Sequence, residues 1–240
     1  MQRGIAIRYG LTLLTWLWVS ILIPTASARA ADAIEIHYGD NAQVELIDAR
    51  GTRVLIDIND PEGLTRPPDA ADTLLTTHSH GDHRRLDFVK AFPGQQLDMQ
   101  TGHIQQTDVD IRGIASSHHA DGKLRDKDGS NYIFIVDMAG LRIAHFGDIG
   151  QARLTPEQLA VLGHVDIAIT QLANRFSDMT AANKKGFNLM DQLRPRLIIP
   201  THILQPICAE MASEKWAACE TYKRALIISS ANLPAEPTIV

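Results

Sequence analysis

The chain has 240 residues, of which 45% are hydrophobic and 21% charged, which is enough apolar material for one globular domain with a sizeable core. This composition excludes a disordered or fibrous protein. The formal net charge of −5 excludes the broad basic surface that nucleic-acid binding by counterion release requires, so nucleic acid is not expected as a global partner.

The first thirty residues have the pattern of a secretory signal peptide. Arg3 and Arg8 form a basic start, residues 11–23 are apolar, and the stretch ends in small residues at positions 28–30. The alternative is an uncleaved membrane anchor, but the apolar run is shorter than the roughly 20 residues that cross a bilayer, and Pro24 ends it. We therefore expect a signal peptide over residues 1–30, one domain over residues 31–240, a periplasmic or secreted protein, and no stable membrane insertion after cleavage.

Two cysteines, Cys208 and Cys219, lie near the C-terminus and far in sequence from any cluster of histidines. In an oxidising compartment they can form a disulfide if the segment between them is not one straight helix. On a continuous helix they would lie roughly 16 Å apart, too far to bond. Both alternatives, a disulfide and free thiols, remain open.

The first half of the domain is rich in strands. Residues 34–38, 44–48 and 53–58 are short apolar or alternating segments, and residues 49–52 form a turn between the last two, which predicts an antiparallel meander. The apolar segment 73–76 runs directly into a histidine cluster. A helix is expected to follow at 84–92.

The second half returns to strands and then adds helices. Strands are expected at 109–115, 132–137, 141–145, 166–170 and 196–200, and helices at 155–163 and 180–193. Thr155, Pro156 and Gln158 predict the start of the first of these helices, because they match a capping box with proline at the first helical position. Two strand-rich halves, each followed by helices, indicate an α/β fold with sheets packed face to face and helices outside.

Residues 77–83 read Thr-His-Ser-His-Gly-Asp-His and place four metal-binding side chains directly after a strand. Alternate residues of an extended segment point the same way, so His78 and His80 can bind one metal together. The chain turns at Gly81, so Asp82 and His83 face a neighbouring position. The alternative is a polar loop with incidental histidines, which this density of metal-binding residues disfavours.

The motif His-x-His-x-Asp-His after a strand resembles the signature of metallo-β-lactamase-fold hydrolases. Three downstream segments, 113–118, 144–148 and 200–202, follow in the order that this family has. The resemblance covers nearly the whole chain after the leader and is greatest to the branch with ascorbate-6-phosphate lactonase-like proteins. It implies a four-layer αββα sandwich of the metallo-β-lactamase type.

The resemblance also implies a set of ligands for two divalent ions. The first ion would take His78, His80 and His118, the second Asp82, His83 and His202, and Asp148 would bridge both. Nitrogen and oxygen ligands suit Zn²⁺ first, with Mn²⁺ or Fe²⁺ as alternatives according to supply.

The remaining histidines are given other roles. His119 is the alternative to His118, although the family pattern favours His118. His145 is expected to pack against the ligands rather than bind metal. His37, His103 and His164 have no partner at metal-binding spacing and are expected to be surface or structural residues.

The expected function is hydrolysis of a small-molecule ester, lactone or phosphodiester by a metal-bridging hydroxide. Asp82 and Asp148 would be the catalytic residues, Asp82 by orienting the hydroxide or accepting its proton and Asp148 by bridging the ions. An aspartate at the bridge, where the commonest zinc β-lactamases have cysteine, argues against antibiotic hydrolysis. The alternative is a non-catalytic periplasmic metal-binding protein with the same fold, which the complete ligand set disfavours. No sequence feature determines the oligomeric state.

One segment departs from the branch that the chain resembles. After strand 166–170, related proteins run into Pro-x-Gly-Gly, whereas this chain has residues 171–176, Gln-Leu-Ala-Asn-Arg-Phe. Losing two glycines changes the backbone freedom of a loop beside the metals, which puts transfer of the lactonase substrate in doubt. We expect Asn174 or Arg175 to contact substrate rather than metal.

Overall fold

The computed structural model describes residues 32–39, 41–119, 121, 130–174, 179–180, 182–202 and 225–240. The predicted signal peptide, the two cysteines and Arg175 lie outside these residues. No helix in the described part of the chain is long and apolar enough to cross a membrane.

The first sheet has six strands and carries the predicted meander. As expected, β2 pairs antiparallel with both β1 and β3, whereas β4 runs parallel to both β3 and β5. The spatial order is β12 (Leu226–Ser229), β1 (Ala33–Tyr38), β2 (Val44–Asp48), β3 (Arg53–Ile56), β4 (Thr73–Thr76) and β5 (Gln95–Asp98).

The second sheet has seven strands. Strands β6 to β9 pair antiparallel, and β9, β10, β11 and β13 run parallel. The β8–β9 turn has positive φ at Ala139 (48°) and Gly140 (72°), as a two-residue type I′ hairpin requires. The spatial order is β13 (Thr238–Ile239), β11 (Leu197–Thr201), β10 (Ile167–Gln171), β9 (Leu141–His145), β8 (Ser130–Met138), β7 (Val109–Ser117) and β6 (Gly102–Gln105).

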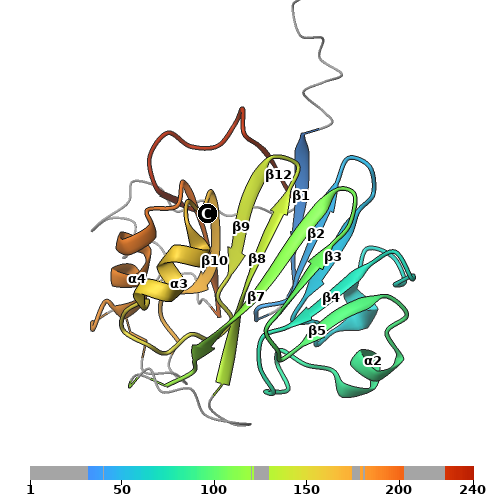
Figure 1. Cartoon of the computed structure of the whole chain (residues 1–240), viewed down its shortest axis with the longest axis horizontal. Coiled ribbons are helices and arrows are strands. Elements are labelled where there is room, and N and C mark those ends of the chain that lie inside the picture. Colours follow the sequence, from blue (N-terminus) through green and yellow to red (C-terminus); the bar gives the residue numbers. More distant parts are fainter. Residues whose placement is uncertain are drawn as a thin grey trace, which may run out of the picture.

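Alternation along the strands divides the core into three apolar layers. On β8, Phe134 and Val136 face the cluster between the sheets, whereas Ile133 and Ile135 face the outer cluster. Helices α3 (Pro156–Leu162) and α4 (Lys185–Leu193) pack on that outer cluster, and α2 (Leu86–Ala91) packs on the outer face of the first sheet. Figure 1 shows these helices on opposite sides of the two sheets. The predicted αββα sandwich is confirmed.

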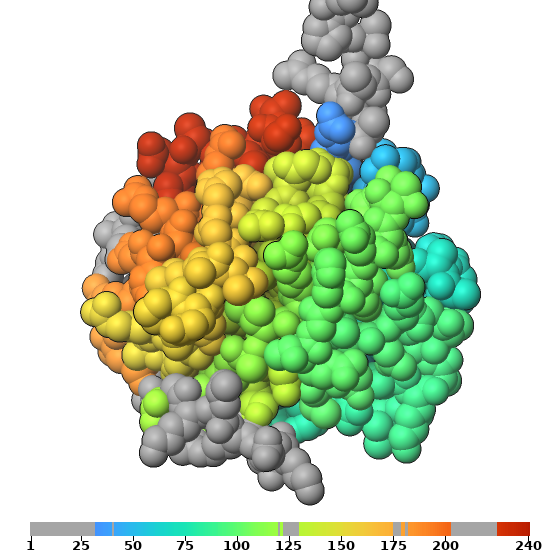
Figure 2. All heavy atoms as spheres, viewed as in Figure 1, coloured from blue at the N-terminus to red at the C-terminus, as the bar shows by residue number. Residues whose placement is uncertain are grey.

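The same arrangement is visible in the packing of the whole molecule. In Figure 2 the green segment that includes β5 to β7 lies on one side of the visible face, and the yellow to orange segment with α3 and α4 lies on the other. A short 3-10 helix, η1 (Pro61–Gly63), completes the elements in the loop between β3 and β4.

The predicted start of α3 is confirmed. Thr155 accepts a hydrogen bond from the Gln158 N–H at 3.2 Å, and Gln158 Oε1 accepts one from the Thr155 N–H at 2.9 Å. The helix ends at Gly163, which has a φ of 58°. Local sequence alone therefore specifies this helix.

The other two helices are shorter than predicted, and their late starts have local causes. Helix α4 begins at Lys185 rather than residue 180, because Thr180 and Asn183 hydrogen bond to each other in a turn and Lys184 is left-handed, with a φ of 55°. Helix α2 begins at Leu86 because Arg85 is still extended. Strands β5, β6, β12 and β13 were not predicted; they have two to four residues each, which is too short for a clear alternating pattern.

Candidate metal centre

The predicted ligands lie where strands end. Residues 77–83 follow β4, His118 follows β7, Asp148 follows β9, and His202 follows β11. Strands β7, β9 and β11 run in the same direction, so their carboxyl ends lie at one edge of the second sheet. Segments far apart in sequence are therefore brought to a single site.

The first group of ligand atoms belongs to His78, His80, His118 and Asp148, and these atoms all lie within 4.8 Å of one another. His78 Nε2 is 3.2 Å from His80 Nδ1. Asp148 Oδ2 is 3.9 Å from His78 Nε2 and 3.7 Å from His118 Nε2. The group contains the residues expected for the first ion together with the expected bridge.

The second group belongs to Asp82, His83 and His202. His83 Nε2 is 3.1 Å from His202 Nε2, and the two rings stack. Asp82 Oδ2 is 3.4 Å from His202 Nε2 and 4.0 Å from His83 Nε2. These are the residues expected for the second ion.

Asp148 lies between the two groups. Its Oδ2 faces the first group, while its Oδ1 is 3.5 Å from His83 Nε2 and 3.4 Å from His202 Nδ1. One carboxylate thus presents a separate oxygen to each group, which is the arrangement that a bridging ligand needs.

Buried atoms without hydrogen bonds test whether these residues fit metal ions. His118 Nε2, Asp148 Oδ1 and His202 Nδ1 are buried and have no hydrogen-bond partner among the described residues. Unpaired buried polar atoms are costly, and metal ions would satisfy them. Ligands about 2.1 Å from a metal lie about 3.0–3.4 Å from one another, close to the shorter separations here. The donor set therefore fits divalent metal ions.

The electrostatics of the centre keep His78 neutral and Asp82 and Asp148 anionic. Burial, followed by the charge of His83, lowers the pKa of His78 to about 3, so its ring is neutral and offers a lone pair. The hydrogen bond from His202, together with the charge of His83, outweighs the opposing effect of burial and lowers the pKa of Asp82 to about 2. Burial would raise the pKa of Asp148, but His118 and His83 hold it well below its usual range. Both carboxylates are anionic at neutral pH.

His83 differs from His78 because a second carboxylate lies behind it. Burial alone would lower the pKa of His83, but Asp57 and then Asp148 raise it to about 10. The Asp57 Oδ2 accepts from His83 Nδ1 at 2.7 Å, which directs Nε2 toward the second group. The effect of Asp57 on His83 is therefore both electrostatic and geometric.

Asp57 is a functional residue that the sequence reasoning missed, since it was placed within strand 53–58. The strand ends at Ile56, and Asp57 is fully buried with a φ of 53°. Its carboxylate also accepts from the N–H and the hydroxyl of Thr77, each at 2.7 Å. The available signal was a single acidic residue inside the apolar run of residues 54–58.

The remaining histidines lie as expected. His119 is partly exposed and lies outside both ligand groups, so the structure brings His118 rather than His119 to the site. His145 is fully buried, with Nε2 3.1 Å from the Ala42 carbonyl oxygen and Nδ1 accepting from the Gly147 N–H at 3.2 Å. Three histidines pair with nearby carboxylates instead: His37 with Glu35, His103 with Asp110, and His164 with Asp166.

The segment that departs from the resembled branch reaches the centre through Asn174. Its side-chain amide is 3.4 Å from Asp148 Oδ2, and the residue is buried. The prediction that Asn174 or Arg175 contacts substrate is not tested by these contacts and stays a prediction.

The amino-acid sequence that forms this fold and these two ligand groups is similar to a known protein family. The model of a family described as the β-lactamase superfamily domain matches residues 35–202, which include all seven predicted ligands. The chain belongs to the β-lactamase superfamily. The matched range includes strands β2 to β11 and every segment that carries a predicted ligand.

Relatives in sequence agree with this membership, and a solved structure has the same fold. A "UPF0173 metal-dependent hydrolase" from Thermococcus onnurineus is 24% identical over 195 residues, 70% of this chain and 84% of the relative. One of the same description from Heliobacterium modesticaldum is 26% identical over 187 residues, 65% of this chain and 77% of the relative. A Thermotoga maritima structure, described as a candidate Zn-dependent hydrolase of the metallo-β-lactamase superfamily, has a TM-score of 0.62 at 21% identity and covers 86% of this chain and 97% of its own.

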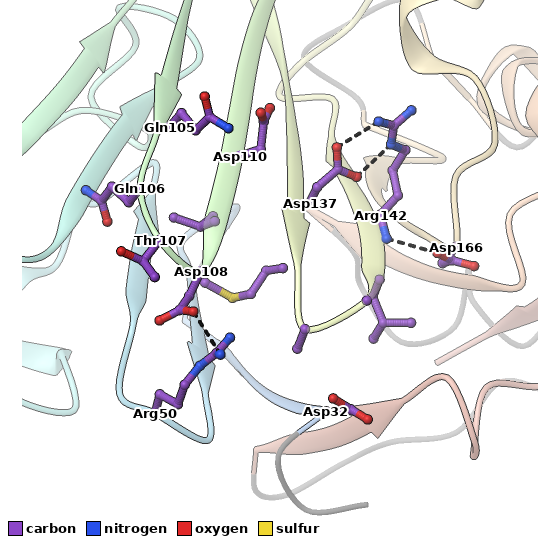
Figure 3. Close-up of a pocket in the computed structure, with 15 residues that line it drawn as sticks. Asp32, Arg50, Gln105, Gln106, Thr107, Asp108, Asp110, Asp137, Arg142 and Asp166 are labelled. Carbon is purple, nitrogen blue, oxygen red and sulfur yellow. Dashed lines mark hydrogen bonds and ion pairs between the residues drawn. The ribbon is translucent and has the colours of Figure 1, made fainter. Parts of the chain in front are cut away.

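A separate hollow of about 610 Å³ lies beside the β6–β7 and β8–β9 turns, and no predicted ligand lines it. Figure 3 shows two of its aspartates pointing toward arginines: Asp108 is 2.8 Å from Arg50, and Asp137 is 2.7 Å from Arg142. The charges of Asp108 and Asp137 are therefore paired with neighbouring arginines, and the hollow lies apart from both ligand groups.

Proposed function

We propose that this protein is a dinuclear metal-dependent hydrolase of the β-lactamase superfamily. The observation that carries the proposal is the convergence of seven ligand side chains into two groups, with one oxygen of Asp148 facing each. The description of the relatives as metal-dependent hydrolases supports the same function. Zn²⁺ is the first candidate for the metal, and Mn²⁺ or Fe²⁺ are alternatives, because every ligand atom is nitrogen or oxygen.

Two bound divalent ions would supply an activated water and polarise the oxygen of the bond that is cleaved. The chain's own residues hold the ions and set the charge. His78 is neutral, and Asp82 and Asp148 are anionic at neutral pH. The Asp82 side chain is 43% exposed, in contrast to the buried Asp148, so Asp82 can reach solvent and orient the attacking water or accept its proton.

The proposed substrate is a small molecule with an ester, lactone or phosphodiester bond. Two divalent cations against two carboxylates and one hydroxide leave a net charge near +1 by simple counting, which favours carbonyl or anionic groups. The narrower placement, beside ascorbate-6-phosphate lactonase-like proteins, stays a prediction, and residues 171–176 argue against transferring that substrate directly.

We also propose that the protein is exported and acts in the periplasm or outside the cell. The support is the basic start, the apolar run over residues 11–23 and the small residues at positions 28–30. N-terminal sequencing of the protein from a fractionated culture would test this. A mature chain that starts near Ala31 is the expected result, and an intact leader in the cytosolic fraction would contradict it.

The test of the hydrolase uses the mature protein loaded separately with Zn²⁺, Mn²⁺ or Fe²⁺. Metal content is measured together with hydrolysis of a nitrophenyl phosphodiester, a nitrophenyl ester and a simple lactone. We expect two metal equivalents and turnover of at least one class that a chelator abolishes. Two equivalents without turnover on any class would favour a metal-binding protein that retains the fold.

A further inference from the structure

Asn131, at the start of β8, is fully buried, and its side chain hydrogen bonds to the turn that carries Asp148 and to the end of β7. Its Nδ2 donates to the Phe146 carbonyl oxygen and to Ser116 Oγ, both at 2.7 Å. Its Oδ1 accepts from the Asp148 N–H at 3.0 Å. A carbonyl can only accept and a backbone N–H can only donate, so these main-chain partners fix the direction of the amide.

The start of β8 connects three segments that carry ligands. Through Ser116, whose hydroxyl also donates to the Asn131 carbonyl oxygen at 3.1 Å, it is joined to the end of β7 two residues before His118. The next residue, Tyr132, donates its N–H to the Thr77 carbonyl oxygen at 3.0 Å, one residue before His78. The third connection is the one to Asp148 itself.

The turn that carries Asp148 packs directly against the Asn131 side-chain amide. Gly147 has a φ of 54°, and a Cβ atom there would lie 2.4 Å from Asn131 Oδ1 and 2.6 Å from Thr77 Cβ. The peptide therefore has no room to shift toward β8 or toward the His78 segment. Its position is set by contact with Thr77 and by the hydrogen bonds of Asn131.

We propose that Asn131 is a positioning residue of the metal centre, because its amide fixes the main chain at Asp148 so that each carboxylate oxygen faces a separate ligand group. The inference rests on the proposed function, since it takes those two groups as metal ligands. Removing the amide leaves the Asp148 N–H and the Phe146 carbonyl buried without partners. The turn would then be free to rotate, and Asp148 would no longer present one carboxylate oxygen to each ligand group.

The experiment compares Asn131→Ala with Asp48→Ala. Asp48 is also buried, and its carboxylate accepts from the Arg50 and Thr52 N–H groups within its own turn, which carries no ligand. Both variants lose a buried partner of main-chain N–H groups. The readouts are the affinities for the first and second equivalents of Zn²⁺ by chelator competition and the Tm of the metal-free proteins.

We expect Asn131→Ala to bind the second equivalent of Zn²⁺ at least about tenfold more weakly than the wild type, since removal of residues that orient ligands has effects of this size. Asp48→Ala should lose Tm but keep both affinities. If Asn131→Ala does not fold, Asn131→Ser is used, because serine is too short to reach the Asp148 N–H, and the same loss of affinity is expected.

The outcomes separate this inference from the proposed function. Wild-type affinity for both equivalents in the Asn131 variant would overturn the positioning role alone. An equal loss of affinity in Asp48→Ala would overturn it as well, because the effect would then follow general destabilisation. A wild-type protein that binds no Zn²⁺, Mn²⁺ or Fe²⁺ would overturn the proposed function and this inference together.

Discussion

Replacing Asp57 with asparagine should weaken metal binding without changing any predicted ligand. The Asp57 carboxylate receives three hydrogen bonds of 2.7 Å each, from the Thr77 N–H, the Thr77 hydroxyl and His83 Nδ1. An amide has only one acceptor oxygen, so its NH₂ group must face either the Thr77 N–H or the His83 ring. When the NH₂ group faces the His83 ring, His83 Nδ1 has to accept a hydrogen bond from it, and the ring proton moves to Nε2.

That tautomer is the wrong one for a ligand. His83 Nε2 faces His202 Nε2 at 3.1 Å and Asp148 Oδ1 at 3.5 Å, and it binds metal only through its lone pair. Residues that orient a ligand histidine typically contribute a factor of about 10–100 in metal affinity, which corresponds to about 1.4–2.7 kcal/mol. We therefore expect Asp57→Asn to reduce affinity at the second group by about that factor.

The assay is chelator competition with Zn²⁺ on the purified protein, together with ¹⁵N NMR of the histidine rings in the Zn²⁺-bound form, where His83 is neutral, to identify which of its ring nitrogens carries the proton. Asp48→Asn is the matched control, because Asp48 is a buried aspartate whose contacts stay within its own turn. Wild-type affinity in Asp57→Asn, or an equal loss in the control, would refute the reasoning.

Three further predictions concern the bridge, its turn and a buried ion pair. Asp148→Ala should lose metal and hydrolytic activity together, as measured by elemental analysis and the substrate panel, and a variant that keeps both would show that Asp148 is not the bridge. Gly147→Ala should destabilise the protein by about 2 kcal/mol or more in denaturant unfolding, since φ is 54° and the Cβ would lie 2.6 Å from Thr77 Cβ; an unchanged midpoint would contradict this. Burial would raise the pKa of Asp72, but the hydrogen bond from Arg53 holds it below its ordinary value of 3.8. The charged carboxylate therefore stabilises the fold above pH 3.8, and this stabilisation is lost as the pH falls through the lower pKa that Asp72 has in the folded protein. Asp72→Asn should therefore lower the free energy of unfolding by about 2 kcal/mol at pH 7 and by progressively less below pH 3.8. Denaturant unfolding of both proteins over this pH range measures the difference, and a constant difference would contradict the prediction.

Much of the fold follows from patterns between near neighbours in sequence. The capping box of Thr155 and Gln158 predicted the start of α3, and short apolar or alternating segments predicted the central strands of both sheets. Helix α4 was misjudged because a polar turn at Thr180 and Asn183 competes with helix formation there. The short edge strands were missed because their pairing partners, rather than their own residues, make them strands.

The candidate site divides in the same way. The sequence by itself predicted the local cluster of residues 77–83 and, through family resemblance, the other three candidate ligands His118, Asp148 and His202. The tertiary structure decided that Asp57 lies behind His83 and that Asn131 holds the Asp148 turn, over separations of 26 and 17 residues. Asp57 and His83 follow the paired strands β3 and β4, and Asn131 begins β8, which pairs with β9, so both contacts depend on which strands pair. A ligand can therefore be predicted from its residue type and its neighbours in sequence. The residue that orients the ligand is brought to it by the pairing of strands, which no local sequence pattern encodes.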